Sequence, residues 1–100
     1  MNITLPDKTL ISIYSKSNCK NCNIIKDIFN EYNIKYIEIN CDEYLRLDRE
    51  EFIKQMNILL KTNIDTIIQF PIVFDKETLI GTYDQTIQYI KNNLEFYENF

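Results

Sequence analysis

The chain carries two closely spaced cysteines in the segment Cys19-Lys20-Asn21-Cys22, and a third cysteine at Cys41. A pair with this C-x-x-C spacing can bind a metal ion, form a structural disulfide, or exchange electrons between dithiol and disulfide. The sequence contains no histidine, so a redox reaction here would need something other than an imidazole to activate a thiol. The surrounding residues favour one of these three uses.

Metal binding is disfavoured because a structural zinc site usually takes four Cys or His ligands. The chain offers three cysteines and no histidine, so a carboxylate would have to complete the set. A permanent structural disulfide is also disfavoured, since closing so short a loop removes little entropy from the unfolded chain. We therefore predict no bound metal and a redox role for the cysteine pair.

The sequence around Cys19 favours a reactive thiol. An apolar segment, residues 10–15, predicts a strand that ends shortly before Cys19, and a helical pattern follows it. The partial positive charge of a helix N-terminus, together with Lys16 and Lys20, would stabilise a thiolate. Cys22 lies one turn further on the apolar face of that helix, so we predict a buried thiol that resolves a mixed disulfide on Cys19.

Seven elements are predicted along the chain. Strands are predicted over residues 10–15, 35–41, 71–75 and 78–82. Three helices are predicted between and after them, with caps at Ser17 or Asn18, at Asp48 and at Asp84. Their apolar faces are predicted to consist of Cys22, Ile25, Ile28, Phe29 and Tyr32, of Phe52, Ile53, Met56, Leu59 and Leu60, and of Ile87, Ile90 and Leu94.

The predicted order is therefore β-α-β-α-β-β-α. Two strands joined by a helix should be parallel with a right-handed crossover, and the last two strands should form an antiparallel hairpin. We expect an α/β fold in which helices flank a four-stranded mixed sheet, as one domain over residues 1–100. The segment 61–69 fits either a loop or an extra helical turn.

Three motifs resemble the glutaredoxin family. The stretch "YSKSNCKNC" resembles its active-site pattern, in which a lysine lies three residues before the first cysteine. "FPIVF" resembles the Thr-Val-Pro segment, with Pro71 at the cis-proline position, and "LIGTYDQTIQYI" resembles the Gly-Gly-x-Asp-Asp-Thr segment that opens the last helix. The motifs occur in family order over nearly the whole chain. The related thioredoxins carry a tryptophan before their cysteines, and this chain has none.

The resemblance implies the thioredoxin fold and a glutathione-dependent thiol–disulfide oxidoreductase that reduces protein or glutathione-mixed disulfides. It assigns Cys19 as the nucleophile and Cys22 as the resolving thiol. One alternative is a thioredoxin-like carrier in a cytoplasmic protein disulfide relay, without glutathione. Another is a carrier of a [2Fe–2S] cluster between two subunits, which Lys20 disfavours because such family members usually have a small residue at that position.

The resemblance also implies a glutathione site. Lys16 would meet a glutathione carboxylate, the backbone of Phe70 beside Pro71 would pair with the tripeptide, and Asp84 with nearby N–H groups would hold the γ-glutamyl end. Gln55 and Lys61 remain candidates for the glycine carboxylate.

Each of these residues also has a plainer interpretation. Pro71 can simply begin an edge strand, Asp84 can be only a helix cap, Lys16 can be a solvated side chain, and Cys41 fits an inert buried thiol. Departures from the family pattern bear on glutathione affinity more than on thiol chemistry. They are Lys20, Asn21, Gln69, Phe70, Thr82 and Gln85.

Composition excludes several classes of protein. The 100 residues are 45% hydrophobic and 26% charged, as in a globular domain. The net charge is −4 without a basic patch, so we predict no nucleic-acid partner. No apolar run approaches the length of a membrane span, and residues 1–4 lack signal-peptide features, so the simplest location is cytosolic or nuclear. We predict a cytoplasmic protein without a membrane partner, and we expect a monomer. The absence of alanine and the single glycine suggest an AT-rich genome, such as that of a large DNA virus.

Overall fold

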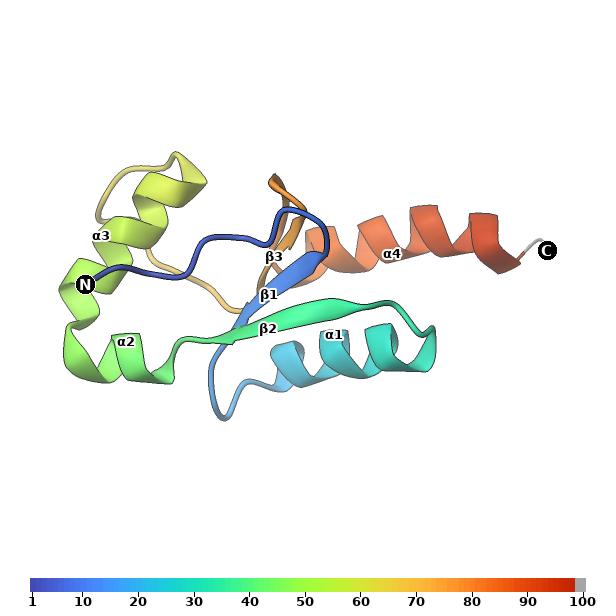
Figure 1. The fold of residues 1–100 in the computed structure, drawn as a ribbon, viewed down its shortest axis with the longest axis horizontal. Helices are drawn as coiled ribbons and strands as arrows, with labels where there is room; N and C mark the ends of the chain where they lie inside the picture. The colour runs from blue at the N-terminus through green and yellow to red at the C-terminus, as the bar shows by residue number, and fades with distance from the viewer. Residues whose placement is uncertain (99–100) are drawn as a thin grey trace.

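The computed structural model describes residues 1–98, with side chains described up to residue 93. Its elements are β1 (Ile11–Ser15), α1 (Lys20–Glu31), β2 (Tyr36–Asn40), α2 (Asp42–Leu47), α3 (Arg49–Leu60), β3 (Ile72–Asp75), β4 (Thr78–Gly81) and α4 (Tyr83–Glu98). This is the predicted order with one addition, the short helix α2 directly after β2 (Figure 1). No helix within the described residues is long and apolar enough to cross a membrane.

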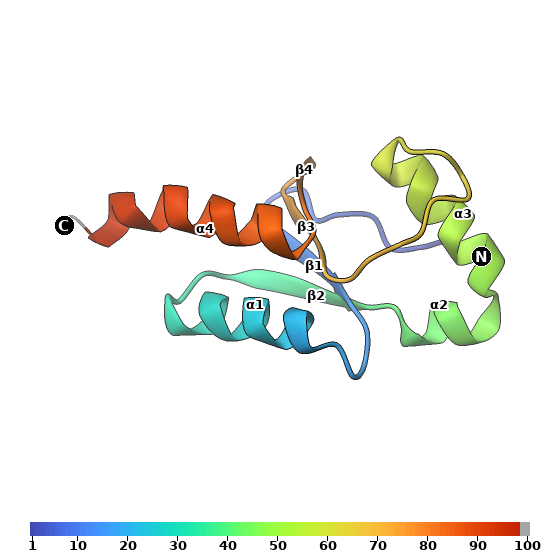
Figure 2. The ribbon, with the colours of Figure 1, turned by 180° about the vertical axis from the view of Figure 1, so that it is seen from behind.

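The four strands form one mixed sheet in the order β2-β1-β3-β4, as predicted. β1 runs parallel to β2, with Ser15 opposite Asn40, and antiparallel to β3, with Tyr14 opposite Ile72. β3 and β4 form the antiparallel hairpin, and α4 starts where β4 ends (Figure 2). Consequently the ends of β1 and β2, the start of β3 and the start of α4 lie toward the same edge of the sheet.

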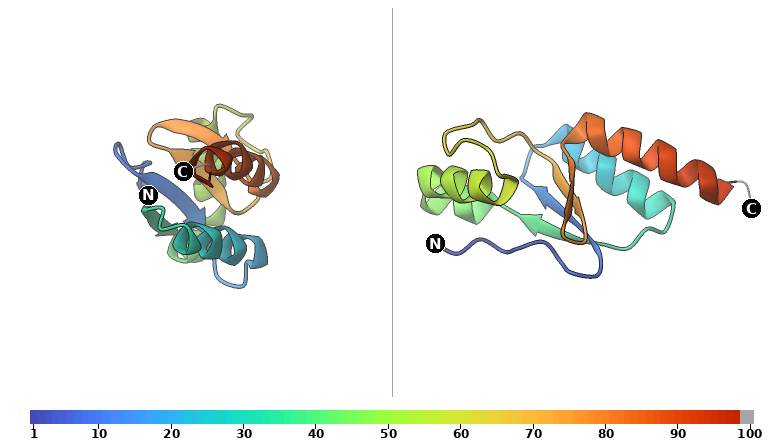
Figure 3. Two further views of the ribbon diagram at one scale, coloured as in Figure 1. Left: turned by 90° about the vertical axis from the view of Figure 1, so that its right-hand side faces the viewer. Right: turned by 90° about the horizontal axis from the view of Figure 1, so that it is seen from above.

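Alternate residues of the strands face two separate hydrophobic cores. Ile13 and Val73 pack with Ile25 and Phe29 of α1 and with Ile90 of α4. The opposite face packs against α3. Its buried residues are Tyr14, Ile39, Cys41, Phe52, Met56, Ile72 and Phe74. Figure 3 shows, from above, α1 and α4 extending together away from the end where α2 and α3 gather. The predicted helix faces are confirmed with one exception: Tyr32 is exposed at the C-cap of α1 rather than packed on its buried face. The side chain of Leu94 lies outside the described residues.

A stack of aromatic rings connects α2 and α3 to the segment before β3. Phe52 is fully buried, and its ring stacks on that of Tyr44 at 5.7 Å and on that of Phe70 at 6.2 Å between centroids. Burying a side chain of this size contributes about 1.5–3 kcal/mol. Because Phe70 directly precedes Pro71, this packing places the start of β3.

Helix starts differ in part from the sequence prediction. Asp48 caps α3 as predicted, because its Oδ1 accepts the N–H of Glu51 at 3.1 Å. The cap of α1, however, is Cys19, whose Sγ accepts the N–H of Cys22 at 3.2 Å. Neither predicted residue serves this role. Asn18 instead adopts the left-handed conformation, with φ of 56°, and Ser17 contacts α2.

The prediction that Asp84 caps α4 is wrong. Asp84 lies inside the first turn, exposed to solvent. The N–H and the hydroxyl of Thr82 both donate to Oε1 of Gln85, at 3.0 and 2.8 Å. This is the half of a capping box in which a glutamine or glutamate reaches back to the residue before the helix. Aspartate was the expected cap because its carboxylate suits that position, but the register shifts the cap to Thr82.

The ambiguous segment after α3 is a loop. Lys61 ends the helix in the left-handed conformation, with φ of 59°. The loop is held by Asn57, a fully buried side chain of α3, whose Nδ2 donates to the carbonyl of Thr66 at 2.8 Å. The Thr62 hydroxyl donates to Oδ1 of the same amide at 2.6 Å. One buried amide therefore fixes the path of the chain toward Phe70.

Candidate active site

Cys19 and Cys22 form a disulfide at the start of α1, with their Cα atoms 5.3 Å apart. The two cysteines differ in exposure. Cys19 keeps 8% of its surface accessible, whereas Cys22 is fully buried. An incoming thiol or disulfide can therefore reach the pair only from the Cys19 side.

Cys19 lies at the start of α1, where the helix offers backbone N–H groups. The N–H of Cys22 points at the Cys19 sulfur, and the N–H of Asn23 donates to the Cys19 carbonyl at 3.2 Å. Unpaired N–H groups in the first turn of a helix, together with the helix dipole, favour negative charge at this position. The local backbone is thus arranged to stabilise a thiolate on Cys19 when the disulfide is open.

Lys16 and Phe70 lie together, although 54 positions separate them in the sequence. Lys16 follows the end of β1 and Phe70 precedes the start of β3, two strands paired in antiparallel register. The Lys16 ammonium lies 5.9 Å from the centroid of the Phe70 ring, a distance typical of a cation–π contact. The next peptide bond, Phe70–Pro71, is cis, and Pro71 is fully buried.

Asp84 lies toward the same edge of the sheet, because α4 begins directly after β4. Gly81, at the end of β4, pairs with Val73 of β3, so the first turn of α4 follows close to the start of β3. Gly81 has φ of +136°, and a Cβ there would lie 2.7 Å from the Cβ of Gln85. A side chain at this position would be strained as well as crowded. The glycine of the motif thus permits the tight entry into α4.

Of the two candidates for a third glutathione contact, Gln55 is engaged elsewhere. Its Nε2 donates to the carbonyl of Met1 and to Glu51, and its Oε1 accepts the N–H of Ile3 at 3.3 Å. This amide holds the N-terminal segment against α3 and does not present a free group to a ligand. Lys61 is exposed at the end of the same helix.

Comparison with known proteins places this arrangement in a family. The family model for glutaredoxin matches residues 11–80, which include both cysteines and the cis-proline segment. The chain belongs to the glutaredoxin family. Its cysteine pair, which forms the disulfide at the start of α1, lies within the matched residues.

Solved glutaredoxins share the fold. Glutaredoxin 1 from Francisella tularensis, solved with cacodylate, is 28% identical, with 90% of this chain and 96% of that chain covered and a TM-score of 0.63. The buckwheat glutaredoxin–glutathione complex is 20% identical, with 86% and 72% covered and a TM-score of 0.62. Both likenesses confirm the predicted thioredoxin-like fold.

A curated relative matches over a shorter stretch. The glutaredoxin-like protein NrdH of Lactococcus lactis is 41% identical over 34 residues, which are 34% of this chain and 47% of the relative. The match therefore spans about half the length of that relative.

The third cysteine of this glutaredoxin is part of the core. Cys41 is fully buried at the end of β2, and its Sγ donates to the carbonyl of Ile39 at 3.5 Å. Burial raises the pKa of this thiol to about 12, and the charge of Asp42 acts in the same direction. The thiol stays protonated at neutral pH, in agreement with the prediction of an inert packing residue. Elsewhere in the described chain, no three His, Cys, Asp or Glu side chains gather in a way that could hold a metal ion.

Sequence reasoning missed two polar residues of the site, Ser17 and Asp42. Asp42 begins α2 and accepts the N–H of Ser17 at 2.9 Å as well as the Ser17 hydroxyl. The available signal was the run Asn40-Cys41-Asp42 at the end of a predicted strand, because polar residues at the ends of parallel strands meet at one sheet edge.

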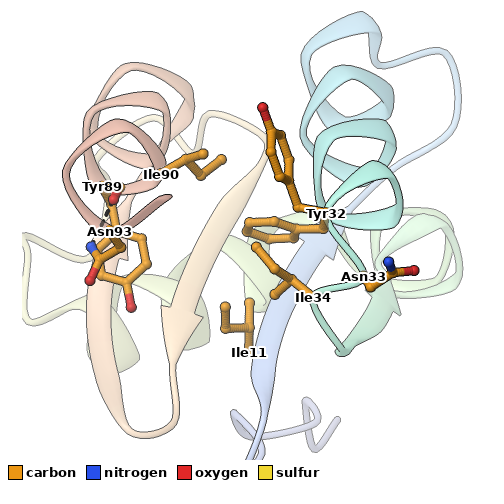
Figure 4. Close-up of a pocket in the computed structure, with 8 residues that line it drawn as sticks. Ile11, Tyr32, Asn33, Ile34, Tyr89, Ile90 and Asn93 are labelled. Carbon is orange, nitrogen blue, oxygen red and sulfur yellow. Dashed lines mark hydrogen bonds between the residues drawn. The ribbon is translucent and has the colours of Figure 1, made fainter. Parts of the chain in front are cut away.

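A cavity of about 400 Å³ lies away from this site, between the end of α1 and α4. Figure 4 shows Ile90 pointing from α4 across the cavity toward Tyr32, at the end of α1. The lining residues are Ile11, Phe29, Tyr32, Asn33, Ile34, Tyr89, Ile90 and Asn93. Ile11 begins β1, whereas the cysteines follow the end of that strand. The cavity is therefore separate from the dithiol.

Proposed function

We propose that this glutaredoxin reduces protein or glutathione-mixed disulfides at the expense of glutathione, with Cys19 as the attacking thiol and Cys22 as the resolving thiol. The observation that carries this proposal is the difference in exposure within one disulfide, 8% for Cys19 and none for Cys22. A substrate sulfur can approach Cys19 directly, while Cys22 is placed to attack the Cys19 sulfur once Cys19 has formed a mixed disulfide.

The reaction would proceed in two exchanges. The Cys19 thiolate attacks a substrate disulfide, forms a mixed disulfide and releases the other substrate sulfur as a thiolate, which takes up a proton. Cys22 then attacks the Cys19 sulfur and releases the second substrate thiol, leaving the Cys19–Cys22 disulfide. Where the intermediate joins Cys19 to glutathione, a second glutathione thiolate can instead attack the glutathione sulfur, which releases Cys19 and forms glutathione disulfide. Two glutathione molecules restore the dithiol and leave as glutathione disulfide, so two electrons pass from glutathione to the substrate.

Glutathione would lie along the edge that joins Lys16, Phe70 and Asp84. Lys16 supplies a positive charge for a carboxylate, and Asp84 supplies a negative charge for the α-amino group. Support comes from the contact between Lys16 and Phe70 and from the exposed position of Asp84 in the first turn of α4. The buckwheat glutaredoxin was solved as a complex with glutathione, which supports glutathione as the class of ligand.

The test is the reduction of a small glutathione-mixed disulfide by glutathione, coupled to glutathione reductase. We expect turnover that depends on the concentrations of both the protein and glutathione. A protein that gives no turnover above the uncatalysed rate in this assay is not a glutathione-dependent enzyme.

A second candidate is a glutathione-independent carrier in a protein disulfide relay. The Thr82 N–H, one of the groups near Asp84 that could have held an anion, is engaged by Gln85. Gln55 is engaged by the N-terminal segment. Both contacts reduce the number of groups free to bind the tripeptide. This candidate predicts that the protein catalyses the reduction of insulin disulfides by dithiothreitol but gives no turnover in the glutathione assay.

A further inference from the structure

The loop before Cys19 is held by a carboxylate from another element. Oδ1 of Asp42 accepts the N–H of Ser17 at 2.9 Å, and Oδ2 accepts the Ser17 hydroxyl. The N–H of Asp42 itself donates to the side chain of Asn40 at 2.9 Å. These bonds join the junction of β2 and α2 to the loop between β1 and α1. These bonds hold Ser17 in place, and Ser17 lies between Lys16 and Cys19 in the sequence.

The same carboxylate is charged and is coupled to Lys16. Hydrogen bonds from the Ser17 hydroxyl and N–H lower the pKa of Asp42, and the side chain of Asn40 and the charge of Lys16 lower it further. Asp42 is therefore ionised at neutral pH. A negative charge beside a thiol disfavours the thiolate, which is the opposite of the effect of a lysine. Charged groups near this edge of the sheet come from three elements and one loop: Lys16, Lys20, Asp42 and Asp84.

We propose that Asp42 is a positioning residue for the reaction, which holds the loop of Lys16 and Ser17 beside Cys19 and partly offsets the positive charge of Lys16 there. The proposal rests on the proposed function, in which Cys19 is the attacking thiol. Stabilising the Cys19 thiolate favours the reduced dithiol and makes the protein a weaker reductant. Asp42 would therefore keep the dithiol reducing while Lys16 keeps Cys19 reactive.

The Asp42→Asn variant separates charge from anchoring, because asparagine keeps an oxygen that can accept the Ser17 N–H. The fully reduced protein is treated with iodoacetamide across a pH series, and modification of Cys19 is followed by peptide mass. We expect the alkylation rate of Cys19 at about pH 6 to rise roughly threefold, as the loss of one charge near the protein surface implies. The difference should shrink in about 1 M salt.

A second measurement follows the equilibrium between the disulfide plus two glutathione molecules and the dithiol plus glutathione disulfide. We expect Asp42→Asn to increase the reduced fraction of the protein at a given ratio of glutathione to its disulfide. Asp42→Glu keeps the negative charge, so its Cys19 alkylation rate and its reduced fraction should both lie closer to those of wild type than the values of Asp42→Asn do. Glu43→Gln is the matched control, because it removes a carboxylate charge from the same helix. The Glu43 carboxylate contacts Arg46, with Oε2 at 2.6 Å from Nη2, and not Ser17.

The results of these experiments distinguish failure of the Asp42 proposal from failure of the proposed function. If wild-type Cys19 reacts no faster than free cysteine at about pH 6, the proposed function fails before any variant is compared. If wild-type Cys19 is reactive but Asp42→Asn changes neither readout, Asp42 has no role in the reaction, even if the variant melts at a lower temperature. Equal changes in Asp42→Asn and Glu43→Gln would also overturn the proposal, because they would show only a general effect of net charge.

Discussion

At the scale of single residues, the two cysteines of the disulfide should divide the reaction between them. Cys19→Ser removes the accessible sulfur and should abolish turnover with both protein and small substrates. Cys22→Ser should retain reduction of the small glutathione-mixed disulfide, because a second glutathione can resolve the intermediate. The same variant should lose most reduction of protein disulfides. The coupled assay run on both substrates checks this, and equal loss from the two variants on the small substrate would contradict the assignment.

Asp84 and Lys16 can be tested as ligands for glutathione. Because Gln85 rather than Asp84 completes the cap of α4, Asp84→Ala should leave the melting temperature nearly unchanged. We expect it to raise KM for the glutathione-mixed disulfide several-fold, since an exposed ion pair contributes about 0–1 kcal/mol. Lys16→Ala should raise KM similarly and also slow the alkylation of Cys19.

Asp27→Ala is the control for that pair, since Asp27 is an exposed carboxylate on α1. An unchanged KM in Asp84→Ala would remove this residue from the glutathione site and favour the relay without glutathione.

At the scale of secondary-structure elements, the strands and the three longer helices were predictable because each carries a periodic apolar face. Helix α2 was not, since its six residues are too few to show a helical period. Only Tyr44 and Leu45 of this helix pack against the core, and both are only partly buried. The interaction between Ser17 and Asp42 was missed for a different reason. It depends on where β1 and β2 end beside each other, which a local sequence pattern does not encode.

The loop between α3 and β3 should depend on one buried side chain, Asn57. Asn57→Ala leaves the carbonyl of Thr66 and the hydroxyl of Thr62 without their partner. We expect a loss of about 1–3 kcal/mol in the free energy of unfolding, measured with denaturant, because unpaired buried polar groups are costly. Lys54→Ala, an exposed change on the same helix, should be close to neutral. If both variants unfold at the same denaturant concentration, the amide does not hold the loop.

At the scale of the whole molecule, hydrogen bonds join the N-terminal segment to β1 and α2. The hydroxyl of Tyr14, a fully buried residue of β1, donates to the carbonyl of Thr4 at 2.6 Å, and the Thr4 N–H donates to the hydroxyl of Tyr44 at 3.0 Å. The N-terminal segment thus packs across β1 and α2 on the α3 side of the sheet. Neither contact could be predicted from the sequence, because residues 1–8 have no periodicity that indicates a partner.

On the opposite side of the sheet, Glu38 connects three elements and should make stability depend on pH. Its Oε2 accepts the hydroxyl of the buried Ser15 at 2.5 Å and the ammonium of Lys26, on α1, at 2.9 Å. The Ser15 hydroxyl, and after it Lys26, hold the pKa of Glu38 below its ordinary value of 4.5. A carboxyl group whose pKa is lowered on folding makes its full contribution to the stability of the folded state at pH values above its ordinary pKa. That contribution is lost as the pH falls through the pKa of the group in the folded state.

Glu38→Gln should therefore be less stable than wild type at neutral pH, by about 0.5–1 kcal/mol in the free energy of unfolding. The estimate is small because the Glu38 side chain is 35% exposed and its charge is partly screened. The difference should narrow as the pH falls well below 4.5, where wild-type Glu38 also becomes neutral. Denaturant unfolding of both proteins at neutral and acidic pH measures this. Glu43 pairs with Arg46, and their side chains are 71% and 66% exposed. Glu43→Gln should therefore show no measurable loss in the free energy of unfolding at either pH. A Glu38→Gln deficit that stays constant on acidification would assign the contribution to hydrogen-bond geometry rather than to charge.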